Sequence, residues 1–434
     1  MQGINKEELK KFKSNYENKD YSASHAALAR TEMKDVVYLP QNAAKLARDF
    51  SIEVKTRGIT AQLKSGRCWM YSMLNILREQ VAEKCNLDEF KLSSNYIIFY
   101  DKLEKANNFM EMIIEHKDKP LSDHWNEYIL KGPGDGGYFD MARDLVKKYG
   151  VIPEYVMPDT YQSSHTESFL KIYIHMLHKA AYTLRKAIKE HQDVQAIKQE
   201  LLSEIYQLEC ICFGTPVESF DFVYHDKDGE YHEEKDITPQ EFYSKYCDIQ
   251  LDNFVTLTNQ ITENKPLNSH FTFHYIGSMA DGCIDCVNVS IEEIEKACIA
   301  QLQDGMPVWF GCDAGAYGDR LEGVWDPDSF AYKSLLGIDW DMEKSQRLKH
   351  RDSFATHAMI LTGVNLDENG KPNRWKVENS WGKDVGKDGY FVLSEKYFKE
   401  YVYEAIIDKK HLTQAQLDIY NSQPIEILPW ESDC

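Results

Sequence analysis

The spacing of apolar residues changes along the chain, from helical periodicity in the early part to short runs of strand length after about residue 300. Residues 168–210 are strongly helical and are interrupted by a polar Glu-His-Gln-Asp run, which predicts two helices. We therefore expect an α+β protein whose active site lies between a helical lobe and a β-rich lobe. The later runs with the length of buried strands are 308–313, 358–364, 374–377 and 389–394.

Composition and charge exclude several classes of protein. Hydrophobic residues make up 43% of the 434-residue chain, which is too many for a disordered protein. The 70 acidic and 50 basic residues give a net charge of −20, so we do not expect nucleic acid as a partner. No apolar run approaches the roughly 20 residues that a membrane helix needs, and the charged N-terminus lacks the apolar core of a secretion signal. We expect a cytoplasmic protein that does not contact a membrane.

The chain has ten cysteines, which is too sparse for the disulfide framework of a small secreted domain. In a reducing cytoplasm most of them should be buried free thiols. Cys283 and Cys286 form a lone Cys-x-x-Cys pair, which could serve a redox or zinc site or could simply be buried. Because no second pair accompanies it, we favour burial and expect no metal or cofactor.

Cys68 is the cysteine best suited to chemistry. It follows Gly66 and Arg67, and apolar residues recur at helical spacing directly after it, so it should open an amphipathic helix. A thiol at that position faces unpaired backbone N–H groups and the positive end of the helix, both of which favour the nucleophilic thiolate. The alternative is an inert, buried cysteine at a helix start.

A nucleophilic thiol needs a base and a group that orients the base. Among 14 histidines, His357 is unusual because it opens the apolar run 358–364, from which a side chain can project into a cleft. Asn379 follows the next predicted strand, and its amide could accept a hydrogen bond from the imidazole. Gln62 lies six residues before Cys68, so its amide could join the Cys68 N–H as an oxyanion donor. A core histidine and a turn asparagine are the structural alternatives.

The order and local sequence of these residues resemble the papain-like cysteine peptidases, and more narrowly the bleomycin hydrolase and bacterial aminopeptidase C branch, over about residues 50–410. The resemblance implies a two-lobed papain-like fold with a helical insertion and terminal arms. It also implies hydrolysis of peptides through a thioester intermediate. The matching segments are 62–69, 135–141, 148–153, 304–313, 356–364 and 375–382.

The resemblance implies a role for each candidate catalytic residue. Cys68 is the nucleophile, and His357 is the base and later the acid. Asn379 orients His357, and Gln62 supplies an oxyanion donor. Because all four positions carry the expected residue types, an inactive scaffold is disfavoured.

The resemblance also implies three residues that contact or surround the substrate. Trp381 matches an indole that shields the histidine and asparagine from water. Gly136 and Gly137 match a glycine pair whose backbone holds the extended substrate, although the pair could also be a simple turn into a helix. The family usually has glutamine after this pair, where the chain has Tyr138.

The last residues bear on the kind of peptidase action. In this branch a C-terminal arm folds back into the cleft, where its terminal carboxylate, here on Cys434, meets the substrate's ammonium group and gives aminopeptidase action. Residues 428–430 resemble the arm, but the ending that follows is shorter and more acidic. We expect an aminopeptidase, with an endopeptidase or oligopeptidase as the alternative if the shorter arm leaves the cleft open.

The resemblance divides the chain into five parts and implies an assembly. Members of the branch form ring-shaped homohexamers, which implies a homo-oligomer here, with peptides as the other partners. The five parts are an N-terminal extension (1–50), a helical lobe with the nucleophile (51–165), a helical insertion (166–255), a β-rich lobe with His357 and Asn379 (256–410) and a C-terminal arm (411–434).

Overall fold

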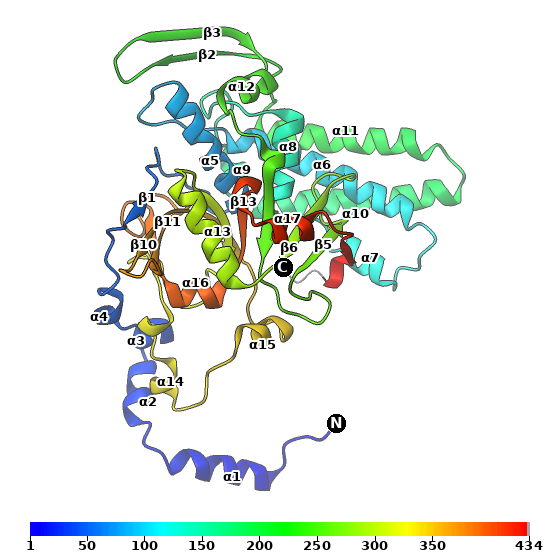
Figure 1. Ribbon diagram of the computed structural model, residues 1–434. Coiled ribbons are helices and arrows are strands. Elements are labelled where there is room, and N and C mark those ends of the chain that lie inside the picture. The colour runs from blue at the N-terminus through cyan, green and yellow to red at the C-terminus, as the bar shows by residue number, and fades with distance from the viewer. Residues whose placement is uncertain (432–434) are drawn as a thin grey trace.

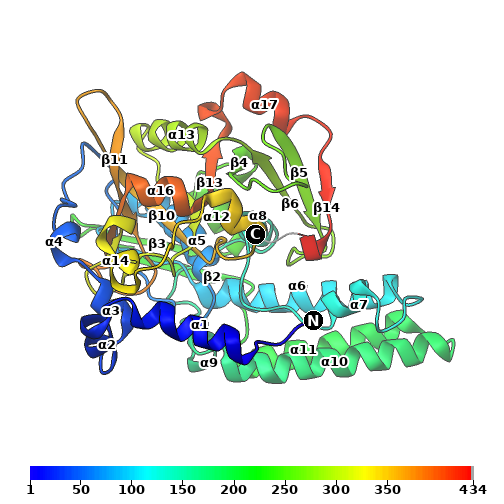
Figure 2. The same ribbon diagram turned by 90° about the horizontal axis from the view of Figure 1, so that it is seen from below.

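The protein has a helical lobe packed against a lobe built on a large sheet (Figure 1, Figure 2). The structure is a computed structural model that describes residues 1–431. In both views α10 and α11 lie side by side along α6. The helices of this lobe are α5 (Cys68–Lys84), α6 (Ser94–Glu115), α7 (His124–Ile129), α8 (Phe139–Tyr149), α9 (Tyr161–Ser164), α10 (Glu167–Lys189), α11 (Val194–Phe213) and α12 (Pro239–Tyr246).

Among the described residues, twelve strands form one sheet in the order β14-β5-β6-β4-β13-β7-β10-β11-β12-β9-β8, with β1 paired to β10. A separate hairpin, β2 (Phe220–His225) with β3 (Tyr231–Ile237), projects beyond α12 (Figure 1). The strands of the sheet are β1 (Ile52–Glu53), β4 (Phe254–Thr258), β5 (Ser269–His274), β6 (Cys283–Asn288), β7 (Val308–Cys312), β8 (Gly318–Asp319), β9 (Val324–Trp325), β10 (His357–Leu366), β11 (Pro372–Glu378), β12 (Tyr390–Ser394), β13 (Val402–Asp408) and β14 (Ile425–Ile427).

Shorter helices cover the sheet and extend from the N-terminus. Helix α1 (Lys6–Glu17) buries none of its residues, whereas Val37 in α3 is buried. In the part of the chain that the structure describes, no helix combines the length and hydrophobicity needed to cross a membrane. The remaining helices are α2 (Ser22–Leu28), α3 (Met33–Val37), α4 (Pro40–Ala43), α13 (Ile291–Gln303), α14 (Tyr332–Leu336), α15 (Lys344–Lys349), α16 (Glu395–Tyr401) and α17 (Gln414–Tyr420).

The centre of the sheet brings His357 to the helical lobe. Strand β10 is buried from His357 to Val364 and pairs antiparallel with β7, so that His357 faces Cys312 and Ala358 faces Gly311. Such a strand is apolar on both faces because helices pack on both sides of it, here α5 and α13. The Trp309 indole N–H of β7 donates to the carbonyl of Trp69 in α5 (3.2 Å), which ties the two lobes together beside Cys68.

The structure confirms the helix that begins at Cys68 and the two helices α10 and α11. It also confirms strands at β7, β10, β11 and β12. The expected start of the strand-rich region near residue 300 is wrong, because β4, β5 and β6 precede it. Strand β4 is fully buried although it contains Thr256 and Thr258. The Thr258 hydroxyl donates to the Tyr403 carbonyl (2.9 Å), so a backbone group satisfies this buried polar side chain. A search for apolar runs in the sequence would place such a residue at the surface.

A buried ion pair joins the helix that carries Cys68 to the strand end that carries Asn379. The Arg78 guanidinium of α5 donates to Glu378 of β11 at 2.9 Å, and both side chains are almost completely buried. Arg78 also donates to the Gly58 carbonyl (2.8 Å) and to Glu79 (2.8 Å). The pair thereby fixes α5 against the segment that leads into Asn379.

Replacing Arg78 by methionine should destabilise the protein by about 3–5 kcal/mol, since it leaves Glu378 buried without its partner. Replacing Lys91, whose 3.8 Å pair with Glu154 is exposed, by methionine should cost less than about 1 kcal/mol. Urea unfolding followed by circular dichroism measures both. Equal losses of unfolding free energy in the two variants would show that the buried pair contributes no more to stability than an exposed one.

Candidate active site

Cys68 is the first residue of α5 and is reached through a tightly held turn. Arg67 is completely buried and donates to Asp159 (2.8 Å) and to Ser94 (2.9 Å). A side chain at Gly66 would lie 2.7 Å from the Cβ of Asp135, so only glycine fits there without movement. The turn therefore fixes where the helix begins and where the thiol points.

The Cys68 sulfur lies among backbone N–H groups. Burial raises the pKa of the thiol, while the N–H groups of Ala358, Trp69 and Cys68 itself act to lower it. Two of these donors belong to the first residues of α5, as expected for a thiol at a helix N-terminus. The third follows His357 directly, which brings the thiol next to the start of β10.

His357 is held in one orientation by Asn379. Its Nε2–H donates to Asn379 Oδ1 at 2.9 Å, and the Ser380 N–H donates to the same oxygen at 2.8 Å. With Nε2 protonated, the neutral ring keeps Nδ1 as its acceptor for a proton. The Trp381 indole stacks on the imidazole, with ring centroids 4.8 Å apart. The structure thus brings together His357, Asn379 and Trp381 as the sequence predicts.

The surroundings of His357 disfavour its charged form. Burial lowers the pKa of His357 to about 4, the hydrogen bond to Asn379 opposes that shift, and the positive charge of Arg320 adds to it. The Arg320 guanidinium lies 4.7 Å from the centre of the Trp381 ring. A negative thiolate nearby would act in the opposite direction and favour the imidazolium.

Gln62 is buried between the turn before Cys68 and the segment after Asn379. Its Nε2 donates to the Ser65 carbonyl (2.8 Å), and its Oε1 accepts from the Ser380 hydroxyl (2.8 Å). The Gln62 backbone N–H donates to the Ser380 carbonyl as well (2.8 Å). These contacts hold the amide in place, and its nitrogen has a second hydrogen beyond the one given to Ser65.

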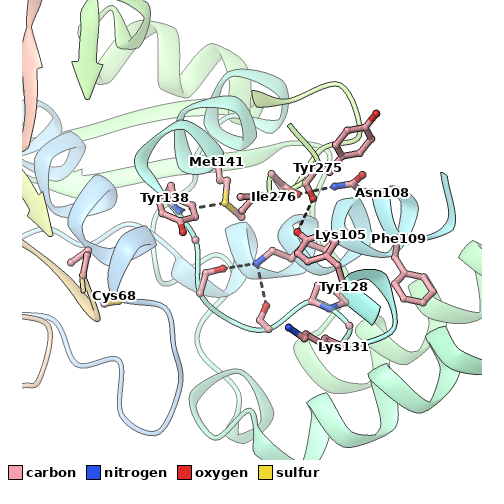
Figure 3. Close-up of a pocket in the computed structure, with 18 of the residues that line it drawn as sticks. Cys68, Lys105, Asn108, Phe109, Tyr128, Lys131, Tyr138, Met141, Tyr275 and Ile276 are labelled. Atoms are coloured by element: carbon pink, nitrogen blue, oxygen red, sulfur yellow. Dashed lines mark hydrogen bonds between the residues drawn. The ribbon is translucent and has the colours of Figure 1, made fainter. Parts of the chain in front are cut away.

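A cavity of about 470 Å³ opens beside Cys68. Figure 3 shows Cys68 on one side of it and Phe109 and Lys131 on the other. The wall is mainly apolar and aromatic, as is usual for a site that binds an organic ligand. Its residues include His357, Gly136, Gly137, Tyr138, Tyr128, Met112, Met141, Trp309, Ile276 and Glu404.

The predicted glycine pair forms part of this wall. A side chain at Gly137 would lie 2.5 Å from the indole of Trp69, whereas one at Gly136 would meet nothing within 4 Å. The Lys105 ammonium donates to the Gly136 carbonyl at 2.8 Å and to the Gly134 carbonyl at 3.2 Å (Figure 3). Burial lowers the pKa of Lys105 to about 8. The glycine segment is thus anchored from α6 and lies directly on α5.

The C-terminal arm runs toward the cavity. Strand β14 pairs in parallel with β5, and Figure 2 shows it descending from α17 toward α7. Beyond it, Trp430 packs edge-on against Trp125, with ring centroids 5.0 Å apart. Trp125 belongs to α7, whose residues Tyr128 and Ile129 line the cavity. The predicted contact of Cys434 with substrate lies outside the described residues.

The Cys-x-x-Cys pair lies on a single strand. Cys283 and Cys286 are both in β6, and Cys286 is buried. Within residues 1–431, the side chains close enough to share a metal ion are Asp226, Glu230 and His232 at the β2–β3 turn. None of these three lines the cavity beside Cys68.

The sequence interpretation missed the charged residues of the cavity, of which Lys105 and Glu404 are buried and Lys131 is exposed. Lys105 is in α6 and Glu404 is in β13. A charged residue within a predicted core strand or helix could have indicated a functional site, because charged side chains are rarely buried without a partner.

A thiol at a helix N-terminus, an imidazole oriented by an amide and an apolar cleft are together the arrangement of a papain-like cysteine peptidase. Comparisons with known proteins agree. Residues 3–433 match the model of the Peptidase C1-like family. The chain belongs to this family and is a cysteine-type peptidase.

The relatives are similar over almost their whole length. Aminopeptidase C of Listeria monocytogenes serovar 1/2a is 39% identical, with 98% of this chain and 97% of the relative covered. Aminopeptidase G of Lactobacillus delbrueckii subsp. lactis is also 39% identical, with 98% of each chain covered. The crystal structure of pepw from Lactobacillus rhamnosis HN001 superposes with a TM-score of 0.96 at 35% identity, covering 99% of this chain and 98% of that one.

Replacing Arg320 by glutamine should raise the pKa of His357, because it removes a positive charge that disfavours the imidazolium. The rate of iodoacetamide alkylation at Cys68 across pH, together with NMR titration of His357, measures the change. Replacing Lys383, an exposed cation two residues after Trp381, by glutamine is the control and should shift the titration less. An unchanged or lowered pKa in the Arg320 variant would rule out this electrostatic effect.

Proposed function

We propose that the protein is an aminopeptidase that uses Cys68 as nucleophile, His357 as base and acid, and Asn379 and Gln62 as supporting groups. The observation that carries the catalytic part is the hydrogen bond of His357 Nε2 to Asn379 beside a cavity that also exposes Cys68. An imidazole held in this way has its other nitrogen directed to accept a proton from a thiol.

The reaction proceeds in two stages. The Cys68 thiol gives its proton to His357 and attacks the peptide carbonyl, and the tetrahedral oxyanion accepts hydrogen bonds from Gln62 and the Cys68 N–H. His357 then passes the proton to the leaving amine as the C–N bond breaks, which leaves a thioester. In the second stage His357 takes a proton from water, hydroxide adds to the thioester carbonyl, and the proton returns to the departing sulfur.

Binding by the glycine segment complements this chemistry. The Gly137 backbone lies at the cavity wall, and its missing side chain lets both Trp69 and a substrate backbone approach. Trp381 covers the His357 ring and excludes water from its bond to Asn379. Water exclusion strengthens that hydrogen bond and keeps the imidazole aligned.

The aminopeptidase part rests on relatives and on the arm. Proteins named aminopeptidase C, G and W are 38–39% identical to the chain over at least 96% of its length. The arm supports the same action, since Trp430 packs on α7 and α7 lines the cavity. A segment packed at the far end of a cleft limits how much peptide can extend beyond the residue bound next to Cys68. Cytoplasmic location and the homohexamer stay predictions.

Replacing Cys68 by serine should lower peptidase activity by roughly 10⁴-fold or more, because a hydroxyl is a far weaker nucleophile in this setting. The control is Cys212→Ser, which changes a half-buried free thiol on α11 and should leave activity intact. Hydrolysis of an aminoacyl coumarin amide measures both variants. Retained activity in the Cys68 variant, with circular dichroism showing both proteins folded, would exclude the thioester mechanism.

A peptide with a free N-terminus should be cleaved after its first residue, and the same peptide with an acetylated N-terminus should be a poor substrate. Removing residues 431–434 should increase turnover of the acetylated peptide, since the arm then limits the cleft less. Mass spectrometry of the products measures both effects. Efficient internal cleavage of the acetylated peptide by the full chain would favour the endopeptidase alternative.

A further inference from the structure

Glu404 reaches toward the cavity across a strand that has no side chain in its way. In the sheet Glu404 of β13 faces Gly311 of β7, and Gly311 faces Ala358 of β10. A Cβ on Gly311 would lie 2.8 Å from Glu404 Cγ and 3.0 Å from its Cδ. The Glu404 side chain therefore lies over the glycine. Its direction is toward Ala358, whose N–H faces the Cys68 sulfur.

Glu404 is buried, and its carboxylate has no partner among the residues that the structure describes. Glu404 is 7% exposed and lines the same cavity as Cys68. Among the described residues that line this cavity it is the one acidic side chain. No side chain or backbone N–H within residues 1–431 forms an ion pair or hydrogen bond with its carboxylate. The charge of another carboxyl group, Asp140, acts to raise the pKa of Glu404 further.

An unpaired carboxylate in such a place is costly, and a cation would relieve the cost. Burial raises the pKa of Glu404 to about 7, and Asp140 adds to the shift. Asp140 has a partner of its own, Arg143, at 2.5 Å. The Lys105 ammonium of the cavity is already engaged by Asp101 and by the carbonyls of the glycine segment. The cation that would pair with Glu404 is thus missing from the described chain and fits a ligand.

We propose that Glu404 binds the α-ammonium group of the substrate's N-terminal residue. The inference rests on the proposed aminopeptidase action and names the group that recognises the free amine. In the thioester the amine nitrogen is two bonds from the carbonyl carbon on sulfur. Adjacent strands lie about 4.8 Å apart, so a glutamate two strands from Ala358 that extends back over Gly311 comes within reach of that amine.

The α-ammonium fits this position better than a basic side chain does. The carboxylate lies over Gly311, which faces Ala358 beside Cys68, so its ligand lies near the reacting carbonyl. Its charge also acts to raise the pKa of the Cys68 thiol. A lysine or arginine side chain would carry its charge several bonds farther away. The described acidic residues of the arm, Asp418, Glu426 and Glu431, do not line the cavity. Glu431 accepts a hydrogen bond from the Leu428 N–H at 3.4 Å.

The first test compares Glu404→Gln with the parent on aminoacyl and N-acetylaminoacyl coumarin amides. We expect kcat/KM for the free amine to fall about 10- to 100-fold, the loss of one charged hydrogen bond, with the acetylated substrate changed by less than about threefold. Alanyl and arginyl substrates should fall together. A loss confined to the arginyl substrate would overturn the proposal in favour of a site for basic side chains. Glu368→Gln, in an exposed turn, is the matched control for removal of a charge.

The second test does not depend on peptidase activity. The 2-bromoethylammonium ion places its ammonium nitrogen two bonds from the carbon that alkylates Cys68, as in the thioester, whereas iodoacetamide is neutral. We expect the ratio of their alkylation rates to fall in Glu404→Gln, with the iodoacetamide rate unchanged. Equal ratios of the two alkylation rates in the parent and the variant would overturn the role of Glu404, whatever the result of the peptidase assays. A parent enzyme that cleaves free and acetylated substrates equally would instead overturn the aminopeptidase assignment.

A stability measurement separates binding from a structural role. Because burial raises the pKa of Glu404 from 4.5 to about 7, the protein loses stability as pH rises through that range, and the full cost of the buried carboxylate is present at pH 8. The melting temperature of the Glu404→Gln variant should therefore be no lower than that of the parent at pH 8. The Glu404→Asp variant keeps a carboxylate and should keep part of the preference for substrates with a free amine. Marked destabilisation of Glu404→Gln at pH 8 would assign the residue to structure and overturn the proposal.

Discussion

The buried ion pair between Arg78 and Glu378 is the contact on which the geometry of the site depends. Arg78 is on the helix that begins with Cys68, and Glu378 directly precedes Asn379. A charge pair this deeply buried is stable only when both partners are present and well oriented. It therefore sets the position of the thiol helix relative to the imidazole and amide. Two hydrogen bonds between Gln62 and Ser380, one donated by each residue, reinforce the same junction next to the site.

Absent side chains matter as much as the functional ones. Gly66 lets the turn before Cys68 pack against Asp135, and Gly137 lets the cavity wall lie on Trp69. Gly311 gives the Glu404 side chain the space to cross β7. Each glycine allows two parts of the chain to approach to a distance that a methyl group would prevent. The cavity beside Cys68 is shaped by these close approaches together with the aromatic residues around it.

The sequence predicts the features that depend on neighbours along the chain. The helix at Cys68, the strand that begins at His357 and the position of Asn379 after β11 follow from local periodicity and motif order. Features that depend on strand register cannot be predicted from the local sequence. Glu404 lies beside the cavity only because β13 pairs with β7 and β7 pairs with β10, and nothing in the local sequence fixes that alignment. The strands β4 and β5 contain buried polar residues, which make them look exposed in the sequence. In the fold, backbone carbonyls accept hydrogen bonds from Thr258 of β4 and His270 of β5.

The central claim is that Cys68 forms a thioester with the first residue of a peptide. Mass spectrometry of the enzyme, quenched in acid during the first turnover of an unblocked pentapeptide, tests it directly. We predict one adduct on the proteolytic fragment that contains Cys68, with the mass of the single N-terminal residue. An adduct on another cysteine, or an acyl group of two or more residues on Cys68, would contradict the account.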